Sequence, residues 1–395
     1  MVQRKFYLDK LKKLKDKQII KVITGVRRCG KSTLLKQFRD YLLHECNVSD
    51  EQIIFINFED LAYENLLDYK LLYSYITERI ADDKMNYIFL DEIQSVENFQ
   101  KAVDSLFIKS NVDLYITGSN AHLLSSELAT LLSGRYIEIS ILPLSFAEYY
   151  ELIGGDQRVA WQKYFKYGGF PYAAGLDDDD IRNDYLKGIY HTVLLKDIVT
   201  RKKVQDVMLL ESVVKFLFDN VGNMVSSKKI ADSLISNGRK TTSVTVENYI
   251  NALTESFVLY KTGRYDVKGK QHLKSLEKYY LVDVGLRRLL IGDKNADIGH
   301  LLENIVYLEL IRRGYSVTIG KIGDLEIDFI AERAGEKIYY QVAASVLSPE
   351  TFQREITPLK KINDHYPKFI ISMDEFSMNE DGIRQIYILD FLLQD

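Results

Sequence analysis

The sequence predicts an α/β fold for residues 1–144, and three observations support this prediction. Short apolar runs alternate with stretches of helical periodicity, the pattern of a parallel sheet with helices on both faces. A glycine-rich loop separates the first run from the next helix, and a later run ends in two neighbouring carboxylates. The expected strands are residues 19–24, 53–58, 87–90, 112–117 and 136–142.

The glycine-rich loop has the spacing G-x-x-x-x-G-K-S and reads Gly25-Val26-Arg27-Arg28-Cys29-Gly30-Lys31-Ser32. Its backbone N–H groups can surround a phosphate, and the helix that begins near Lys31 adds its positive amino end. We expect Lys31 to neutralise the β- and γ-phosphates of ATP and Ser32 to bind Mg²⁺ through its hydroxyl. The predicted nucleotide-binding residues are Gly25, Arg27, Arg28, Cys29, Gly30, Lys31, Ser32 and Thr33.

Two carboxylates, Asp91 and Glu92, follow the apolar run of residues 87–90, as in the Walker B strand of a nucleotide-binding sheet. We expect Asp91 to bind Mg²⁺ through water, and Glu92 to orient and polarise the water that attacks the γ-phosphate. The next strand ends in Ser119 and Asn120, either of which could contact the γ-phosphate or that water. A turn with a helix cap explains these two residues equally well.

Length and composition allow two to four folded domains, since the chain has 395 residues and 46% of them are hydrophobic. Only two cysteines occur, Cys29 and Cys46, so neither a disulfide framework nor a zinc site is expected. The first residues lack the apolar core of a signal peptide, and no apolar run is long enough to cross a bilayer. We therefore expect a cytoplasmic protein with no membrane partner.

Residues 145–204 have helical periodicity and are predicted to form a helical lid on the nucleotide domain. The sequence Gly168-Gly169-Phe170-Pro171 interrupts this pattern. The acidic run 177–180 could suggest a metal site, but four consecutive aspartates cannot all face one metal ion. We therefore interpret the run as a solvated turn or a helix start.

Residues 201–280 hold 14 Lys and Arg against 8 Asp and Glu, a net charge of +6, whereas the whole chain carries −4. Within residues 205–284, two helices (228–235 and 246–256) and two strands (258–264 and 278–282) follow in the order of a winged helix. Its second helix would place Thr245, Asn248 and Asn251 in a DNA groove, and its wing would carry Lys268 and Lys270. A structural or oligomer-contact role for this module is equally compatible with the sequence.

Residues 285–395 form a further α/β unit, with helices at 301–312 and 349–362, strands at 315–319, 326–331 and 338–342, and a final strand at 368–372. Glu303 and Asp328 occupy positions where metal-dependent nucleases carry carboxylates. Where such an enzyme would have Glu-x-Lys, this chain has Gln341 and Ala343. The metal ligand and the lysine are both missing, so we expect no nuclease activity.

These motifs together resemble the prokaryotic AAA-type ATPases of the archaeal-ATPase group, which carry a C-terminal PD-(D/E)xK nuclease-like domain of unknown function. The resemblance covers nearly the whole chain and rests on GVRRCGKST, INFED, FLDEIQ, ITGSNA, LLSGRYIEISILPLSFAEYY, YGGFP, KDIVTR, LLENIVYLELIRRGY and EIDFIA. It implies that Arg135 is an arginine finger or a sensor of the γ-phosphate. An arginine with a structural role where its strand begins is the alternative. The resemblance also implies a homo-oligomer.

The combined expectation is a Mg²⁺-dependent ATPase that binds ATP and ADP, couples hydrolysis to conformational change, and acts on DNA as an oligomer. Its catalytic residues would be Lys31, Glu92, Asn120 and Arg135. One alternative is a nucleotide-controlled scaffold that recruits a partner protein without DNA. Another is an ATP-gated nuclease, which Gln341 and Ala343 disfavour.

Overall fold

The computed structural model describes residues 2–81, 83–121, 132, 134–292 and 297–394. The chain divides into two compact units. The amino-terminal unit comprises Met1–Pro143 and Glu255–Phe257, and the carboxy-terminal unit comprises Leu144–Thr254 and Val258–Asp395. Among the described residues, no helix is both long enough and apolar enough to span a bilayer.

The amino-terminal unit is built on a five-stranded parallel sheet with the order β2-β3-β4-β1-β5. Its strands are β1 (Ile20–Thr24), β2 (Ile53–Asn57), β3 (Asn86–Asp91), β4 (Val112–Gly118) and β5 (Tyr136–Ser140). Every residue of β1, β3 and β4 is buried, which explains why these strands have continuous apolar runs in the sequence. The five strands expected from the sequence are confirmed, with ends that shift by one or two residues.

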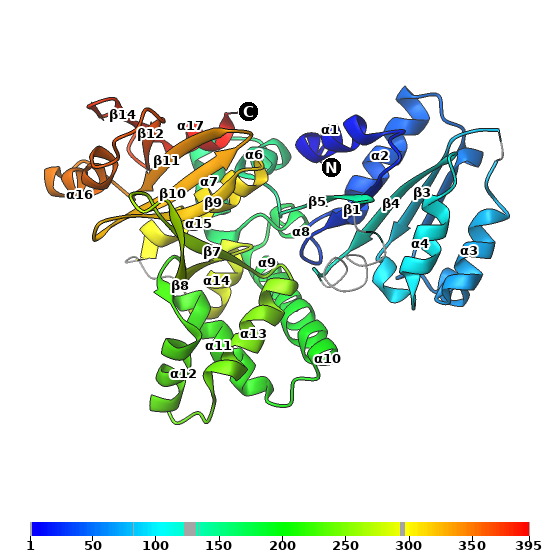
Figure 1. Cartoon of the computed structure of the whole chain (residues 1–395), viewed down its shortest axis with the longest axis horizontal. Coiled ribbons are helices and arrows are strands. Elements are labelled where there is room, and N and C mark those ends of the chain that lie inside the picture. The colour runs from blue at the N-terminus through cyan, green and yellow to red at the C-terminus, as the bar shows by residue number, and fades with distance from the viewer. Residues whose placement is uncertain (1, 82, 122–131, 133, 293–296, 395) are drawn as a thin grey trace. The chain divides into compact units, whose positions relative to one another are not determined.

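Helices cover both faces of this sheet (Figure 1): α1 (Lys5–Leu14), α2 (Lys31–Glu45), α3 (Tyr69–Thr77) and α4 (Phe99–Phe107). On one face, Phe38 of α2 packs against the rings of Phe89 and Tyr115. On the other, residues of α3 and α4 such as Leu72 and Val103 share a core with the alternate strand residues. Among the described residues, the connections include the short 3₁₀ helices Asp50–Gln52, Leu61–Leu66 and Ile93–Ser95.

The carboxy-terminal unit begins with the helical region expected from the sequence. Its helices are α6 (Phe146–Ile153), α7 (Gln157–Tyr167), α8 (Pro171–Ala174), α9 (Asp179–Ile189), the π-helix η5 (Tyr190–Asp197), α10 (Ile198–Lys202) and α11 (Val207–Asp219). Asp178 caps α9 by accepting hydrogen bonds from the N–H groups of Asp180 and Ile181. The acidic run is therefore a helix start, as one of the two interpretations had it.

The helix, turn, helix and ribbon expected in residues 205–284 are present in that order. The two helices are α12 (Ser227–Ser236) and α13 (Ser243–Glu255), and the two strands of the ribbon are β7 (Leu259–Asp266) and β8 (Gln271–Leu281). A short strand, β6 (Met224–Val225), precedes them. β7 and β8 form an antiparallel hairpin, and β6 pairs with β8. Lys268 and Lys270 lie exposed in the turn of this hairpin.

The remaining elements are α14 (Val284–Ile291), α15 (Ile298–Arg312), β9 (Ser316–Ile322), β10 (Leu325–Arg333), β11 (Glu336–Val342), α16 (Pro349–Lys360), β12 (Lys368–Ser372), β13 (Asn379–Glu380), β14 (Ile383–Tyr387) and α17 (Ile388–Leu393). The expectation that the strand at 368–372 is the last was wrong. β14 is short and partly exposed, so its sequence signal is weak, and it is held by parallel pairing with β12.

One nine-stranded sheet, with the order β13-β14-β12-β11-β10-β9-β7-β8-β6, runs through the carboxy-terminal unit. Parallel pairing of β7 with β9 joins the hairpin to the later strands. The sheet thus continues across residue 284, where the sequence analysis placed a domain boundary. The core between this sheet and α16 contains Ile330 and Tyr339 of the strands and Phe352 and Ile356 of α16.

Candidate nucleotide site

The glycine-rich loop connects β1 to α2 at the carboxyl edge of the parallel sheet. Gly25 has φ +148°, and a Cβ atom there would lie 2.2 Å from the carbonyl oxygen of Ile141. Gly30 is the N-cap of α2 with φ 105°. Both positions require glycine, the first because the backbone of residue 141 is so close and the second because its φ is positive.

Lys31 is the first residue of α2, and its side chain is buried against the loop. Its Nζ atom lies 3.2 Å from the carbonyl oxygen of Gly25 and 3.5 Å from that of Val26. The same Nζ atom lies 3.2 Å from Oε1 of Glu92, at the end of β3. The loop lysine and the Walker B glutamate, far apart in the sequence, are therefore in direct contact.

Asp91 is fully buried at the end of β3. Its Oδ1 accepts a 2.6 Å hydrogen bond from the hydroxyl of Thr117, and its carboxylate is also hydrogen-bonded to Ser32. Burial raises the pKa of Asp91, although these two hydrogen bonds oppose the rise. Its Oδ2 is buried and has no partner among the described residues. A partnerless carboxylate oxygen beside the Ser32 hydroxyl matches the oxygen ligands that Mg²⁺ prefers.

Glu92 has a left-handed backbone, with φ 56° and ψ 45°. A non-glycine residue in this region is strained, and such residues cluster at functional sites. Its N–H donates to the Thr117 hydroxyl at 2.8 Å, and its Oε2 lies 2.5 Å from Nε2 of Gln94. Burial acts to raise the pKa of Glu92, but the Lys31 ammonium and the Gln94 amide outweigh it and hold the pKa below its usual value.

Thr117 has a function that the sequence analysis missed. Its hydroxyl accepts from the Glu92 backbone and donates to Asp91, so one side chain on β4 orients both acidic residues. The available signal was a threonine near the carboxyl end of β4, directly before Gly118. Asn120 lies two residues beyond the end of β4, at the same carboxyl edge as the loop.

The other predicted loop residues differ in their surroundings. Arg27 pairs with Glu59 at 2.5 Å, and Arg28 is exposed with φ 69°. Cys29 is fully buried, and its burial raises the pKa of the thiol. Thr33 is half-buried in the first turn of α2.

Arg135 lies at the amino ends of the strands, whereas the loop lies at their carboxyl ends. Its carbonyl accepts from the Ile20 N–H, so it directly precedes the amino end of β5, and its guanidinium pairs with Asp104 of α4. The five residues of β1 separate this edge from the loop, a distance of roughly 15 Å. Arg135 is therefore not brought to the phosphate loop of its own chain.

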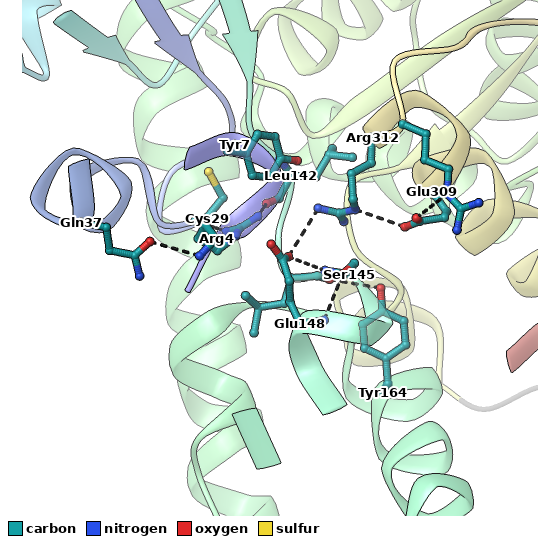
Figure 2. Close-up of polar contacts among 12 residues, drawn as sticks. Arg4, Tyr7, Cys29, Gln37, Leu142, Ser145, Glu148, Tyr164, Glu309 and Arg312 are labelled. Atoms are coloured by element: carbon teal, nitrogen blue, oxygen red, sulfur yellow. Dashed lines mark hydrogen bonds and ion pairs between the residues drawn. The ribbon is translucent and has the colours of Figure 1, made fainter. Parts of the chain in front are cut away.

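Arg4 is a second residue that the sequence analysis missed (Figure 2). It is buried, and its guanidinium donates to the carbonyl oxygen of Cys29 at 2.9 Å and to that of Leu142 at 2.8 Å. Its backbone N–H donates to Gln37 of α2, and the Tyr7 hydroxyl accepts from the N–H of Leu142. Hydrogen bonds from the amino-terminal segment thus link the phosphate loop to the residues that follow β5.

Comparison with protein families agrees with this geometry. The model of an AAA domain matches residues 17–150, and a domain of unknown function, DUF8612, matches residues 158–297. An uncharacterized protein of Haemophilus influenzae is 44% identical over 401 residues, covering 100% of this chain and 99% of that protein. The chain belongs to the family of that protein and carries an AAA-type P-loop domain.

Two further proteins resemble this AAA-domain chain. The uncharacterized protein MJ1544 of Methanocaldococcus jannaschii is 29% identical over 394 residues, covering 94% of this chain and 85% of that protein. The structure of the Walker-type ATPase PABY2304 of Pyrococcus abyssi aligns with a TM-score of 0.54 at 14% identity, covering 73% of this chain and 96% of that one. The latter similarity supports the P-loop ATPase fold.

A buried charged cluster lies in the carboxy-terminal unit of the AAA-domain protein, around Lys278 of β8. Its Nζ lies 2.8 Å from Glu303, 2.6 Å from Glu326 and 4.0 Å from Asp328. Tyr280 donates to the same Glu303 oxygen at 2.7 Å. Glu303 and Asp328, the two carboxylates that the sequence analysis compared with nuclease ligands, both lie within 4.0 Å of this lysine from another strand.

Gln341 and Ala343 occupy the neighbouring strand end. The Gln341 side chain accepts from the N–H of Asp328 at 2.7 Å and donates to Glu355 at 2.9 Å. Ala343 is buried in the core. Among the described residues, no group of three or more His, Cys, Asp or Glu side chains is arranged to hold a metal ion.

Proposed function

We propose that this chain is a Mg²⁺-dependent ATPase whose hydrolytic base is Glu92. The observation that carries the proposal is the contact between Lys31 and Glu92 at the carboxyl edge of the sheet, where a phosphate loop and a strained acidic residue meet. Asp91 and Ser32 would hold Mg²⁺, which when bound would neutralise charge on the β- and γ-phosphates.

The residues of the site have separate tasks in this proposal. Lys31 would exchange its contact with Glu92 for the γ-phosphate, because three phosphate oxygens attract an ammonium more strongly than one carboxylate does. Glu92 would then be free to accept a proton from the attacking water. Asn120, at the same edge, would contact the γ-phosphate or that water.

Arg135 would act on the nucleotide of a neighbouring copy. Arg135 lies at the amino ends of the strands, away from the phosphate loop of its own chain, which argues against a role in its own site. An arginine finger that a second subunit supplies needs a position at the surface of its own subunit. This position supports the homo-oligomer that the family resemblance implies. Arg135→Ala is expected to lower turnover without changing the affinity for ATP, and only under conditions in which the chain assembles.

Binding of ATP tests the nucleotide site directly. Lys31→Ala should abolish binding or turnover, since the phosphate charge loses its main cation. Arg39→Ala is a matched control, because Arg39 lies on the same helix with its side chain 41% exposed. An unchanged ATP affinity in Lys31→Ala, measured by calorimetry with Mg²⁺ present, together with an unchanged rate of phosphate release, would contradict the assignment.

We further propose that residues 205–284 are a winged helix that binds DNA. The exposed lysines of the β7–β8 turn and the exposed Asn248 and Asn251 of α13 support this. Affinity should fall steeply with salt because counterions are released, and Lys268→Glu with Lys270→Glu should weaken binding to all sequences. Absence of DNA binding at low salt would favour the nucleotide-controlled scaffold.

The carboxy-terminal part is proposed to be a nuclease-like fold without nuclease activity. The ammonium of Lys278 lies among the carboxylates that would otherwise bind a metal, and its single positive charge neutralises part of theirs internally. Opposing charges hold the pKa of Glu303 below its usual value despite its burial. The cluster would then serve to fix β8 against α15 and β10.

A further inference from the structure

Gln94 lies in the 3₁₀ turn Ile93–Ser95, directly beyond the proposed hydrolytic base. Its Nε2 is 2.5 Å from Oε2 of Glu92 and 3.5 Å from Oγ of Ser119. A carboxylate only accepts hydrogen bonds, so it is the nitrogen of the Gln94 amide, and not its oxygen, that contacts Glu92.

Resting on the ATPase function proposed above, we propose that Gln94 is a positioning residue that holds the Glu92 carboxylate and orients the attacking water. Neither task is assigned to Gln94 by the phosphate-loop or Walker B motifs. Gln94 would act through Glu92 and the water, and not on the phosphates themselves.

The backbone at Glu92 is what brings these two side chains together. Residues two apart do not face one another on a regular helix. The left-handed φ of Glu92 and the single tight turn that follows fold the side chain of Gln94 back onto that of Glu92. The strained conformation of Glu92 thus has a specific consequence, which is a fixed amide beside the carboxylate.

The carboxylate of Glu92 is held by two groups, and ATP would draw one of them away. Lys31 contacts Oε1, while Gln94 contacts Oε2. Phosphate oxygens attract the charged Lys31 ammonium more strongly than the neutral Gln94 amide. Gln94 is then the group that keeps the carboxylate in place during hydrolysis.

The amide oxygen of Gln94 supplies the second observation. Oε1 is buried and has no hydrogen-bond partner among the residues that the structure describes. A buried acceptor without a donor is costly, and an O–H group entering the site would relieve that cost. The attacking water beside Glu92 has such a group, so the amide would bind the base through its nitrogen and the water through its oxygen.

The test replaces Gln94 by Met, which keeps the length of the side chain and removes both hydrogen bonds. We expect the Kd for ATP to stay within about threefold of wild type and kcat to fall roughly 10- to 100-fold, because positioning of the base and the water is lost. The loss should therefore fall on kcat and not on the Kd for ATP, as expected for a residue that acts through the base and the water. The other residues around Glu92, among them Lys31, Asp91, Thr117 and Ser119, are unchanged in this variant.

Gln52→Met is the matched control. Gln52 is half-buried in the 3₁₀ turn at the amino end of β2, at the opposite edge of the same sheet, and its amide donates to the carbonyl of Met85 at 2.8 Å. This variant loses that hydrogen bond and the one that Gln52 accepts from the N–H of Ser49, but should keep the wild-type kcat. Gln94→Glu is a second variant, which keeps the length of the side chain but has no donor for the ionised Glu92 carboxylate, so its kcat should also fall.

The outcomes separate this inference from the ATPase proposal. Turnover by wild type with an unchanged kcat in Gln94→Met, or an equal loss in Gln52→Met, would overturn the role of Gln94 and leave the ATPase intact. A Kd for ATP that rises in Gln94→Met by as much as kcat falls would also overturn it, because the loss would then be one of nucleotide binding. Absence of turnover in the wild-type protein would overturn both.

Discussion

Replacing Arg4 by Met is expected to destabilise the amino-terminal unit strongly, although Arg4 lies outside every recognised motif. The guanidinium is 2% exposed and donates to two backbone carbonyls, those of Cys29 and Leu142. A hydrogen bond from a charged group contributes about 1.5–3 kcal/mol, so the loss of both should cost about 4 kcal/mol. For a unit of this size the corresponding fall in Tm is roughly 10 °C.

Calorimetry of the full chain, with and without ATP, measures this effect. The first unfolding transition should move down in Arg4→Met, and the affinity for ATP should weaken because the carbonyl of Cys29 belongs to the phosphate loop. Lys5→Met is the control, since Lys5 is the exposed neighbour of Arg4. A change of less than about 1 kcal/mol in Arg4→Met, or an equal loss in Lys5→Met, would show that these two hydrogen bonds do not stabilise the amino-terminal unit.

Two further predictions concern the carboxy-terminal unit. Burial raises the pKa of Asp283 to about 7, although its carboxylate accepts from the N–H groups of Gly169 and Gly285. The unfolded chain therefore ionises Asp283 before the folded chain does, so stability should fall as the pH rises from about 4 to about 7. Asp283→Asn should flatten this part of the profile in urea unfolding, and an unchanged slope would exclude Asp283 as its cause. The purified protein should show no nuclease activity with Mg²⁺ or Mn²⁺, with or without ATP, and cleavage that Asp328→Ala eliminates would contradict the internal neutralisation by Lys278.

Much of the nucleotide site could be predicted from the sequence because it is encoded locally. The phosphate loop is one continuous segment between a strand and a helix. The acidic pair ends a strand that is buried throughout, so its apolar run is unmistakable. Parallel strands then bring these segments to one edge without further information.

The contacts that sequence reasoning missed are made by single polar residues from distant segments. Arg4 reaches Leu142 across 138 positions, and Lys278 reaches Glu303 across 25. Neither residue lies in a pattern that distinguishes it from a solvated arginine or lysine. The same limitation applied to Arg135, whose motif indicated a catalytic cation but whose place on the sheet depends on the register of β5 against β1.

The most direct test of the central claim is phosphate release from ATP by the wild-type protein and by Glu92→Gln, at saturating ATP and Mg²⁺. Wild type is expected to release phosphate, whereas Glu92→Gln should bind ATP as tightly while its turnover falls roughly 100-fold or more, since general base catalysis is lost. Equal turnover by the two proteins would remove Glu92 from the reaction. Absence of phosphate release by the wild-type protein would contradict the ATPase itself.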